Sequence, residues 1–429
     1  MVFTQIQFDQ NPYGTFFAGQ IVTGKVTIQS DKPKNVKGVA LKIYGYAETM
    51  WTESQSVSTT DSKGHSHSTT QSVTYKGRED YLSSVTYLMG SPNSDTISIA
   101  PGIHTFNFAC QLPVTCPSSF EGNKGKVRYL VRVSFIRPWK FDQNTTLGFT
   151  VLKLADLNYD TPVLRMPAQA EIIKNFCCGP CRSKPLILTV KVPKTGYVSG
   201  ENIIVNVDID NPTKTPVKEV KISLNLFATY FSQYPRIHTC VEKFPLAKVK
   251  TTSLGADSQN TITETIRVPP TPPSCTTYCK IIQLMYELHI ETKVGGMHGA
   301  PSVAIPITIG NVPLMQLQNN VEQPIMQSLP VPTSLDDCDG DKNSLPMVNP
   351  IMNATAPYSP DALAPPSYEE SLFLETRANI NEDDKNACDK CDFAPRYPVF
   401  EIPQHEPTAP QSTEAVTPSG TAPKKTTWL

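Results

Sequence analysis

The sequence predicts an all-β protein in which two tandem β-sandwiches, residues 1–156 and 183–311, are followed by a disordered tail. Three observations lead to this prediction. Short segments with an apolar residue at every second position fill the chain up to about residue 309, and no stretch keeps a helical period for three turns. The apolar pattern of the first part recurs in the second. At residue 312 the composition changes, and proline and acidic residues become frequent.

The first sandwich is predicted from its alternating segments. Residues 24–30 (GKVTIQS), 39–48 (VALKIYGYAE) and 126–136 (KVRYLVRVSFI) place apolar and polar side chains on opposite faces of a strand. A sheet of such strands hides one face, so a second sheet is needed to cover it. Residues 52–73 are rich in Ser and Thr, and we expect an exposed loop there.

The second sandwich is predicted from an internal repeat. A shift of 181 residues aligns residues 16–46 with 197–227 without a gap, and it superimposes Gly19 on Gly200. Each glycine opens its unit at a turn, where a residue that tolerates positive φ is expected. Near the end of each unit, matching prolines and a matching tyrosine align with a shift of 156 or 157, so the second copy is about 25 residues shorter. The missing length corresponds to the predicted loop.

Residues 157–182 are predicted to link the sandwiches, and they contain three clustered thiols, Cys177, Cys178 and Cys181. A zinc site needs four ligands, and the nearest CxxC pair lies over 200 residues away in the tail. We therefore predict no metal and no cofactor. Two interpretations of the thiols remain: palmitoylation beside basic residues at a membrane surface, or plain reduced cysteines.

The tail, residues 312–429, differs from the body in composition and charge. It holds 17 of the 39 prolines but only two glycines, and its 17 acidic and 7 basic residues give a net charge of −10. The body carries +9, so the formal net charge of the chain is −1. Such a tail has too little apolar surface to bury, so we predict disorder. The near-neutral total argues against nucleic-acid binding.

The location and the absence of catalysis are predicted from missing motifs. Residues 1–10 have no basic start, and no apolar run approaches the ~18 residues of a membrane-spanning helix. We expect a cytoplasmic protein whose 11 cysteines are reduced. The sequence lacks G-x-S-x-G, H-E-x-x-H and G-x-x-x-x-G-K, so we predict no enzymatic activity and no catalytic residue.

Several long segments resemble the arrestin-domain-containing (alpha-arrestin) family. They are FFAGQIVTGKVTI, LPVTCPSSFEGNKGKVRYLVRVSFIRPW, FTVLKLADLN, YVSGENIIVNVDIDN and IPITIGNVPL, and the resemblance covers about residues 3–314. It implies two arrestin-like, immunoglobulin-type β-sandwiches without an active site. It also implies an adaptor that binds membrane receptors or transporters and recruits ubiquitin ligases through PPxY motifs, which promotes ubiquitination, endocytosis and endosomal sorting.

The tail contains one PPxY motif, PPSY, in which Pro365, Pro366 and Tyr368 are the expected contacts for a WW domain of a HECT-type ubiquitin ligase. Adjacent prolines favour the polyproline II conformation, so little entropy is lost when their rings dock in an aromatic groove and the tyrosine fills a second pocket. A disordered tail suits this role, because a folded flank would hide the prolines.

A second WW-binding candidate is weaker. In APRYPVF, residues 394–400, Ala394 stands where the first proline of a PPxY motif would be, which leaves only Pro395 and Tyr397. One stacking ring is therefore missing, and we expect weak binding or none.

The basic body would attract anionic lipid headgroups and phosphorylated cargo tails, so peripheral association with the plasma membrane and endosomes is expected. Two other functions remain open. A retromer-like coat component would need no PPxY motif. A thioredoxin-binding redox regulator would need a reactive thiol, but SLGADSQNTITETI has no cysteine where that thiol is expected.

Overall fold

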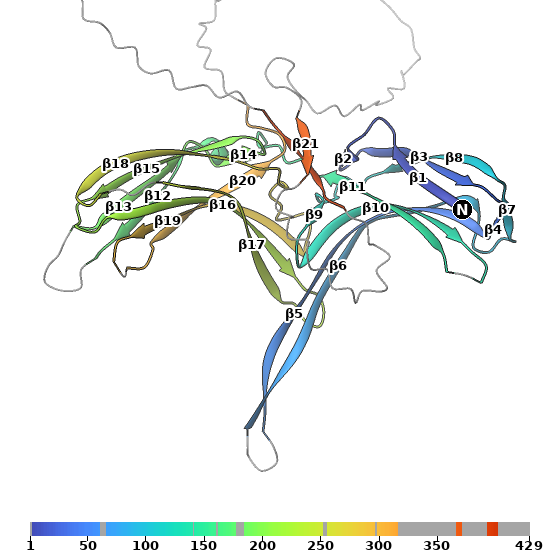
Figure 1. Cartoon of the computed structure of the whole chain (residues 1–429), viewed down its shortest axis with the longest axis horizontal. Helices are drawn as coiled ribbons and strands as arrows, with labels where there is room; N and C mark the ends of the chain where they lie inside the picture. The colour runs from blue at the N-terminus through green and yellow to red at the C-terminus, as the bar shows by residue number, and fades with distance from the viewer. Residues whose placement is uncertain are drawn as a thin grey trace, which may run out of the picture.

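The computed structural model describes residues 2–60, 66–139, 141–159, 162–176, 184–251, 255–296, 298–315, 366–370 and 393–401. Two β-sandwiches lie end to end, with a long two-stranded arm projecting from the body and two short tail strands lying between the sandwiches (Figure 1). Within these residues, no helix is both long enough and apolar enough to cross a bilayer. The prediction of two tandem β-sandwiches is confirmed.

The first sandwich pairs a smaller sheet with a larger one. The smaller sheet has the order β1 (Val2–Phe8), β3 (Ile21–Ser30) and β8 (Gly102–Gln111). The larger sheet has the order β2 (Thr15–Phe17), β11 (Gln143–Leu152), β10 (Gly125–Ile136), β5 (Gly38–Thr60) and β6 (Ser66–Gly90), with β9 (Phe120–Glu121) beside β10. A separate pair consists of β4 (Lys34–Val36) and β7 (Ile97–Ile99).

The second sandwich repeats this arrangement. One sheet has the order β12 (Ala168–Lys174), β13 (Leu186–Val192), β15 (Asn202–Asn211) and β18 (Ser258–Arg267). The other has the order β14 (Gly196–Val198), β20 (Ser302–Gly310), β19 (Ile282–Val294), β16 (Val217–Phe231) and β17 (Thr239–Lys250). A short 3₁₀-helix, Pro162–Arg165, precedes β12.

The internal repeat is confirmed strand by strand. Strands β3 and β15 are offset by the same 181 residues, and the short strands β2 and β14 each pair in parallel with the last long strand of their sandwich. Gly19 has φ 91° and Gly200 has φ 90°, the left-handed region that glycine tolerates. In both copies the repeated tyrosine donates to a proline carbonyl, from Tyr129 to Pro117 at 2.8 Å and from Tyr286 to Pro272 at 2.5 Å.

Alternation along the strands produces the core. In β3, Val26 and Ile28 are fully buried, and Val207 and Ile209 take the matching places in β15. Each such side chain contributes about 1.5–3 kcal/mol when it leaves water. The polar residues between them face solvent, as the period of two requires.

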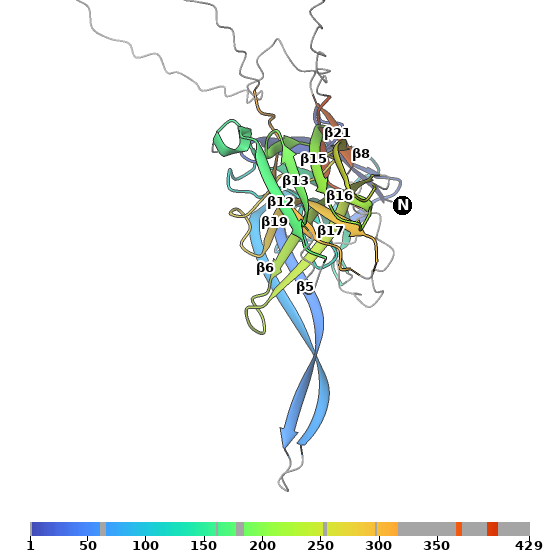
Figure 2. The ribbon, with the colours of Figure 1, turned by 90° about the vertical axis from the view of Figure 1, so that its left-hand side faces the viewer.

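The expected loop at residues 52–73 is instead a two-stranded arm. Strands β5 and β6 remain in antiparallel register out to Thr60 opposite Ser66, and the arm extends well beyond the sandwich (Figures 1 and 2). Its strand segments contain Thr and Val but neither Gly nor Pro, so nothing interrupts the ladder. Side chains also pair across it, as in the 3.1 Å contact between the hydroxyls of Thr52 and Thr74.

The predicted linker, residues 157–182, contains a strand of the second sandwich. Residues 168–174 alternate in burial and form β12, which pairs with β13 in antiparallel register. The second sandwich therefore begins earlier in the chain than the sequence suggested. The thiols Cys177, Cys178 and Cys181 lie outside the described residues.

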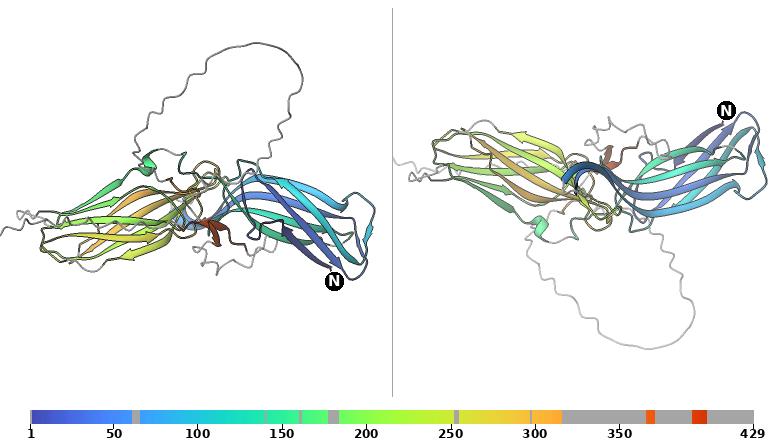
Figure 3. Two further views of the ribbon diagram at one scale, coloured as in Figure 1. Left: turned by 90° about the horizontal axis from the view of Figure 1, so that it is seen from above. Right: turned by 90° about the horizontal axis from the view of Figure 1, so that it is seen from below.

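The predicted disorder of residues 312–429 falls mostly outside the described residues, but two tail segments are folded. Strand β21 (Ser367–Glu370) pairs antiparallel with β22 (Arg396–Val399). This strand pair lies at the junction of the two sandwiches, as the view from above shows (Figure 3).

Candidate partner-binding site

The base of the arm joins the two sandwiches. The rings of Tyr75 and His238 lie 4.6 Å apart, and His238 Nε2 lies 3.0 Å from a carboxylate oxygen of Glu53. The backbone also bridges the gap, because the amide of Lys76 donates to the carbonyl of Tyr234 at 2.8 Å. These contacts link β5 and β6 to the segment between β16 and β17.

A second junction forms where the last strands of the sandwiches end. Asn311 is buried, its Oδ1 accepts from the amide of Ala155 at 2.7 Å, and its Nδ2 donates to the carbonyl of Lys153 at 2.7 Å. Asn158 Nδ2 then donates to the carbonyl of Pro313 at 2.8 Å. The Asn311 side chain thus satisfies one backbone donor and one backbone acceptor in the segment that follows the first sandwich.

The tail strand β22 is seated in the groove between the sandwiches, and we call residues 393–400 the docked segment. Its central side chain, Tyr397, has no exposed surface, and its hydroxyl donates to the carbonyl of Ser119 at 2.9 Å. Burial raises the pKa of Tyr397 well above its ordinary value, so the phenol keeps the proton that it donates. The amide of Arg396 donates to Thr150 Oγ1 at 3.1 Å.

The end of the docked segment reaches the second sandwich. The amide of Phe400 donates to the carbonyl of Ser199 at 2.9 Å. The Phe400 ring is buried in a small cluster with Leu157, Leu164 and Val198. The docked segment therefore bonds to the first sandwich through its middle and to the second through its end.

Two glycines shape the groove. A Cβ at Gly148, on β11, would lie 2.6 Å from Cδ2 of Phe393, and its three nearest neighbours would all be atoms of that side chain. A Cβ at Gly200 would overlap the carbonyl oxygen of Phe400. Each sandwich thus contributes one position where any side chain would obstruct the docked segment.

Strand β21 carries the tyrosine of the PPxY motif. Tyr368 lies opposite Pro398 in the ladder, and its half-buried ring is 5.9 Å from the ring of Tyr13 on the body. Burial raises the pKa of Tyr368. An ion pair of 2.8 Å between Arg396 and Glu370 closes the strand pair. Of the motif prolines, Pro366 is half-buried and Pro365 lies outside the described residues.

A buried ion pair lies beside the docked segment. The side chains of Arg128 and Glu121 are only 12% and 9% exposed and form a two-pronged contact, with Arg128 Nη2 2.9 Å from Glu121 Oε2. The Glu121 carboxylate is close enough to Tyr397 to help raise the pKa of that phenol. A charged pair and a tail tyrosine therefore meet at the interdomain groove.

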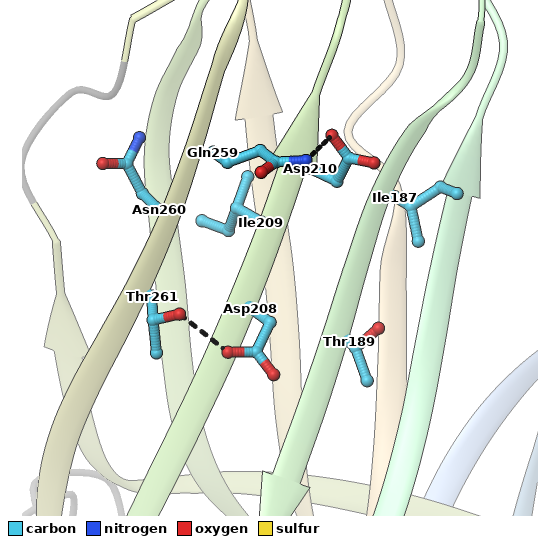
Figure 4. Close-up of a pocket in the computed structure, with 8 residues that line it drawn as sticks. All are labelled: Ile187, Thr189, Asp208, Ile209, Asp210, Gln259, Asn260 and Thr261. Atoms are coloured by element: carbon cyan, nitrogen blue, oxygen red, sulfur yellow. Dashed lines mark hydrogen bonds between the residues drawn. The ribbon is translucent and has the colours of Figure 1, made fainter.

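A shallow hollow on the second sandwich is a weaker candidate. Figure 4 shows side chains of β13, β15 and β18 around it, with Thr261 donating to Asp208 at 2.9 Å and Gln259 donating to Asp210 at 3.2 Å. Hydrogen bonds from Lys191 and Thr261 lower the pKa of Asp208. Both acidic side chains thus already accept hydrogen bonds from neighbouring strands.

A larger cleft of about 730 Å³ lies between the sandwiches and is lined by parts of β19 and β20 and by the segment after β11. Its charged members are engaged internally. Lys153 Nζ donates to the carbonyl of Val114 at 2.6 Å and lies over the Tyr278 ring, and Asp156 accepts from Asn158. The cleft therefore presents mainly apolar and neutral polar surface.

Three of the described thiols, Cys110, Cys116 and Cys279, are buried and therefore poorly placed for redox chemistry. Burial raises the pKa of Cys110 and Cys116 and raises that of Cys279 to about 11, so these groups stay protonated near neutral pH. Across the described ranges, no three His, Cys, Asp or Glu side chains are placed to hold a metal ion.

The docking of residues 393–400 between the sandwiches is the feature of this site that the sequence analysis missed. The weak motif APRYPVF contains the residues that dock, and Tyr397 is buried in the groove rather than presented to a partner. A usable signal was present, because Phe393, Tyr397, Val399 and Phe400 form an apolar run in an otherwise polar, acidic stretch.

The fold and the groove together define a class: a twinned β-sandwich scaffold with a segment of its own tail lying between the two domains. Comparison with known proteins identifies the family. The model of the arrestin (or S-antigen) N-terminal domain matches residues 4–158, and that of the C-terminal domain matches residues 182–314. The chain belongs to the arrestin family, in its arrestin-domain-containing (alpha-arrestin) branch.

Three relatives illustrate the similarity. Arrestin domain-containing protein 17 of Caenorhabditis elegans is 27% identical over 91% of this chain and 97% of its own length. Arrestin domain-containing protein 4 of Mus musculus is 27% identical over 71% of each chain. Arrestin domain-containing protein 1 of Rattus norvegicus is 27% identical over 67% of this chain and 62% of its own length.

Proposed function

We propose that this arrestin-family adaptor binds membrane receptors or transporters and recruits a WW-domain HECT-type ubiquitin ligase through Pro365, Pro366 and Tyr368. The outcome would be ubiquitination, endocytosis and endosomal sorting of the bound cargo. The supporting observation is a PPxY motif in the tail of a twinned sandwich, with its tyrosine on a short strand at the edge of the body. The adaptor itself carries out no reaction in this proposal.

The direct test is titration of a WW domain from a HECT-type ligase against the full chain and its Tyr368→Ala variant. Truncation of a central anchor typically costs about 2 kcal/mol or more, so binding is expected to weaken about thirtyfold or more. Tyr358→Ala, which changes a tail tyrosine outside the motif, is the control and should leave binding unchanged.

Two other results would favour a different motif or a different function. Equal binding by wild type and Tyr368→Ala, with loss in Tyr397→Ala, would transfer the ligase contact to the weaker motif. Binding to neither motif would favour the retromer-like coat alternative, in which no ligase is recruited. The redox alternative gains no support from Cys110, Cys116 and Cys279, because burial raises the pKa of these three thiols.

Peripheral membrane association is supported by the turn between β10 and β11. The side chains of Trp139 and Phe141 are fully exposed there, and Arg137 lies next to them and donates to the carbonyl of Phe141 at 2.8 Å. Aromatic rings beside a cation suit the boundary between lipid headgroups and acyl chains.

We expect a Trp139→Ala/Phe141→Ala variant to bind vesicles containing phosphatidylserine at least about tenfold more weakly than wild type does. Burial of one such ring contributes about 1.5–3 kcal/mol. Sedimentation with vesicles measures the effect, and Ile237→Ala, at another exposed apolar position, is the matched control. Equal loss in the control would remove this turn from the membrane contact.

A further inference from the structure

The PPxY tyrosine is held in a conformation that a WW domain does not bind. WW domains bind PPxY segments in the open polyproline II conformation, with the backbone free of ladder hydrogen bonds. Here Ser367–Glu370 form a β-strand in register with Arg396–Val399, and the Tyr368 ring packs beside Tyr13. A WW domain could take up this tyrosine only after β21 leaves both neighbours.

The partner strand is firmly fixed, because the docked segment makes contacts with both sandwiches. Tyr397 is fully buried and bonded to Ser119, while Phe400 is bonded to Ser199 and packed among apolar side chains. Strand β21 makes fewer contacts with the body, and most of its residues are exposed. The docked segment is thus the template, that is, the fixed strand with which β21 pairs. The PPxY strand β21 is the element that can separate from it.

We propose that the docked segment autoinhibits ligase recruitment by pairing with the PPxY strand. This inference rests on the proposed function, because it concerns access to the same motif. When the pair is formed, Tyr368 is withheld. When the docked segment leaves the groove, the template is lost and the motif becomes available. If the pair is formed in about nine molecules of ten, the apparent Kd is about tenfold weaker than that of the free motif.

The experiment compares the full chain with two variants that release the docked segment by different means. Tyr397→Ala removes its central anchor. Gly148→Val leaves the tail unchanged but places a side chain where the Phe393 ring lies. Gly255→Val is the matched control, because a Cβ at Gly255 meets nothing within 4 Å. A synthetic peptide of residues 360–374 supplies the affinity of the free motif.

We expect the WW domain to bind wild type and Gly255→Val about tenfold more weakly than the peptide. Tyr397→Ala and Gly148→Val should approach the affinity of the peptide, and adding Tyr368→Ala to either should abolish binding. Hydrogen exchange provides a separate measure of docking. The amides of Arg396 and Phe400 should be protected in wild type and should exchange rapidly in Gly148→Val.

The possible failures are distinguishable. Wild type that binds as tightly as the peptide would leave the proposed function intact and overturn the autoinhibition. A gain in Gly148→Val that disappears when Tyr397→Ala is added would mean that Tyr397 itself acts as a ligand, which also overturns it. A peptide that does not bind would overturn the proposed function and with it this inference.

Discussion

Replacing Arg128 by methionine is expected to lower the free energy of unfolding by about 3 kcal/mol, because it leaves the Glu121 carboxylate buried without its partner. In the native protein the two side chains are 12% and 9% exposed and meet through two contacts. Methionine has a similar length, so little packing is lost. Urea denaturation, followed by the fluorescence of Trp51 in the same sandwich, measures the change.

Two further variants distinguish the cost of leaving a buried charge unpaired from the cost of simply losing a charge. Lys191→Met removes one partner of an exposed ion pair, with Asp208, and should cost no more than about 1 kcal/mol. An Arg128→Met/Glu121→Met double variant should recover most of the stability, because no charge then stays buried. If Arg128→Met lowers the free energy of unfolding no more than Lys191→Met does, the buried ion pair is not the source of the effect.

The second large effect is expected from Gly45→Leu, which should cost about 3 kcal/mol through overpacking. Gly45 on β5 lies opposite Tyr129 on β10, and a Cβ at this position would overlap the Tyr129 ring. That ring is fully buried and its hydroxyl is bonded to Pro117, so it has little freedom to move aside.

The internal repeat gives this variant particular interest, because a shift of 181 residues places Leu226 at the position of Gly45. In the second sandwich Leu226 lies opposite Tyr286 and is fully buried. A reader of the sequence would judge leucine acceptable at position 45, whereas the packing forbids it. Gly299→Leu is the control, since a Cβ at Gly299 meets nothing within 4 Å. Similar losses at both positions would exclude the proposed clash.

Much of the fold follows from the sequence because it depends on local periodicity. Period-two burial in β3 and β15, and the glycines at φ near 90°, are consequences of side-chain alternation and turn chemistry. The arm was missed because its Ser and Thr residues are equally typical of an exposed loop. Continuous antiparallel pairing between the consecutive strands β5 and β6, rather than composition, decided the outcome.

The groove could not be predicted in the same way, because its parts meet only in the folded chain. Ser119, Thr150 and Ser199 belong to separate strands or turns, and each offers an ordinary backbone or hydroxyl group. Nothing in their sequence context indicates a peptide-binding role. The sequence analysis identified the motif at Tyr397 as a weak ligand for a WW domain of another protein. It did not predict that the Tyr397 hydroxyl would bind Ser119 of the same chain, 278 residues away.

The arm and the tail strands lie at opposite poles of the molecule. In Figure 1 the arm formed by β5 and β6 points away from the junction on one side, and β21 lies on the other. Under the proposed function, a partner bound along the arm and a ligase recruited to the released Tyr368 would therefore use opposite sides of the body and would not compete for one surface.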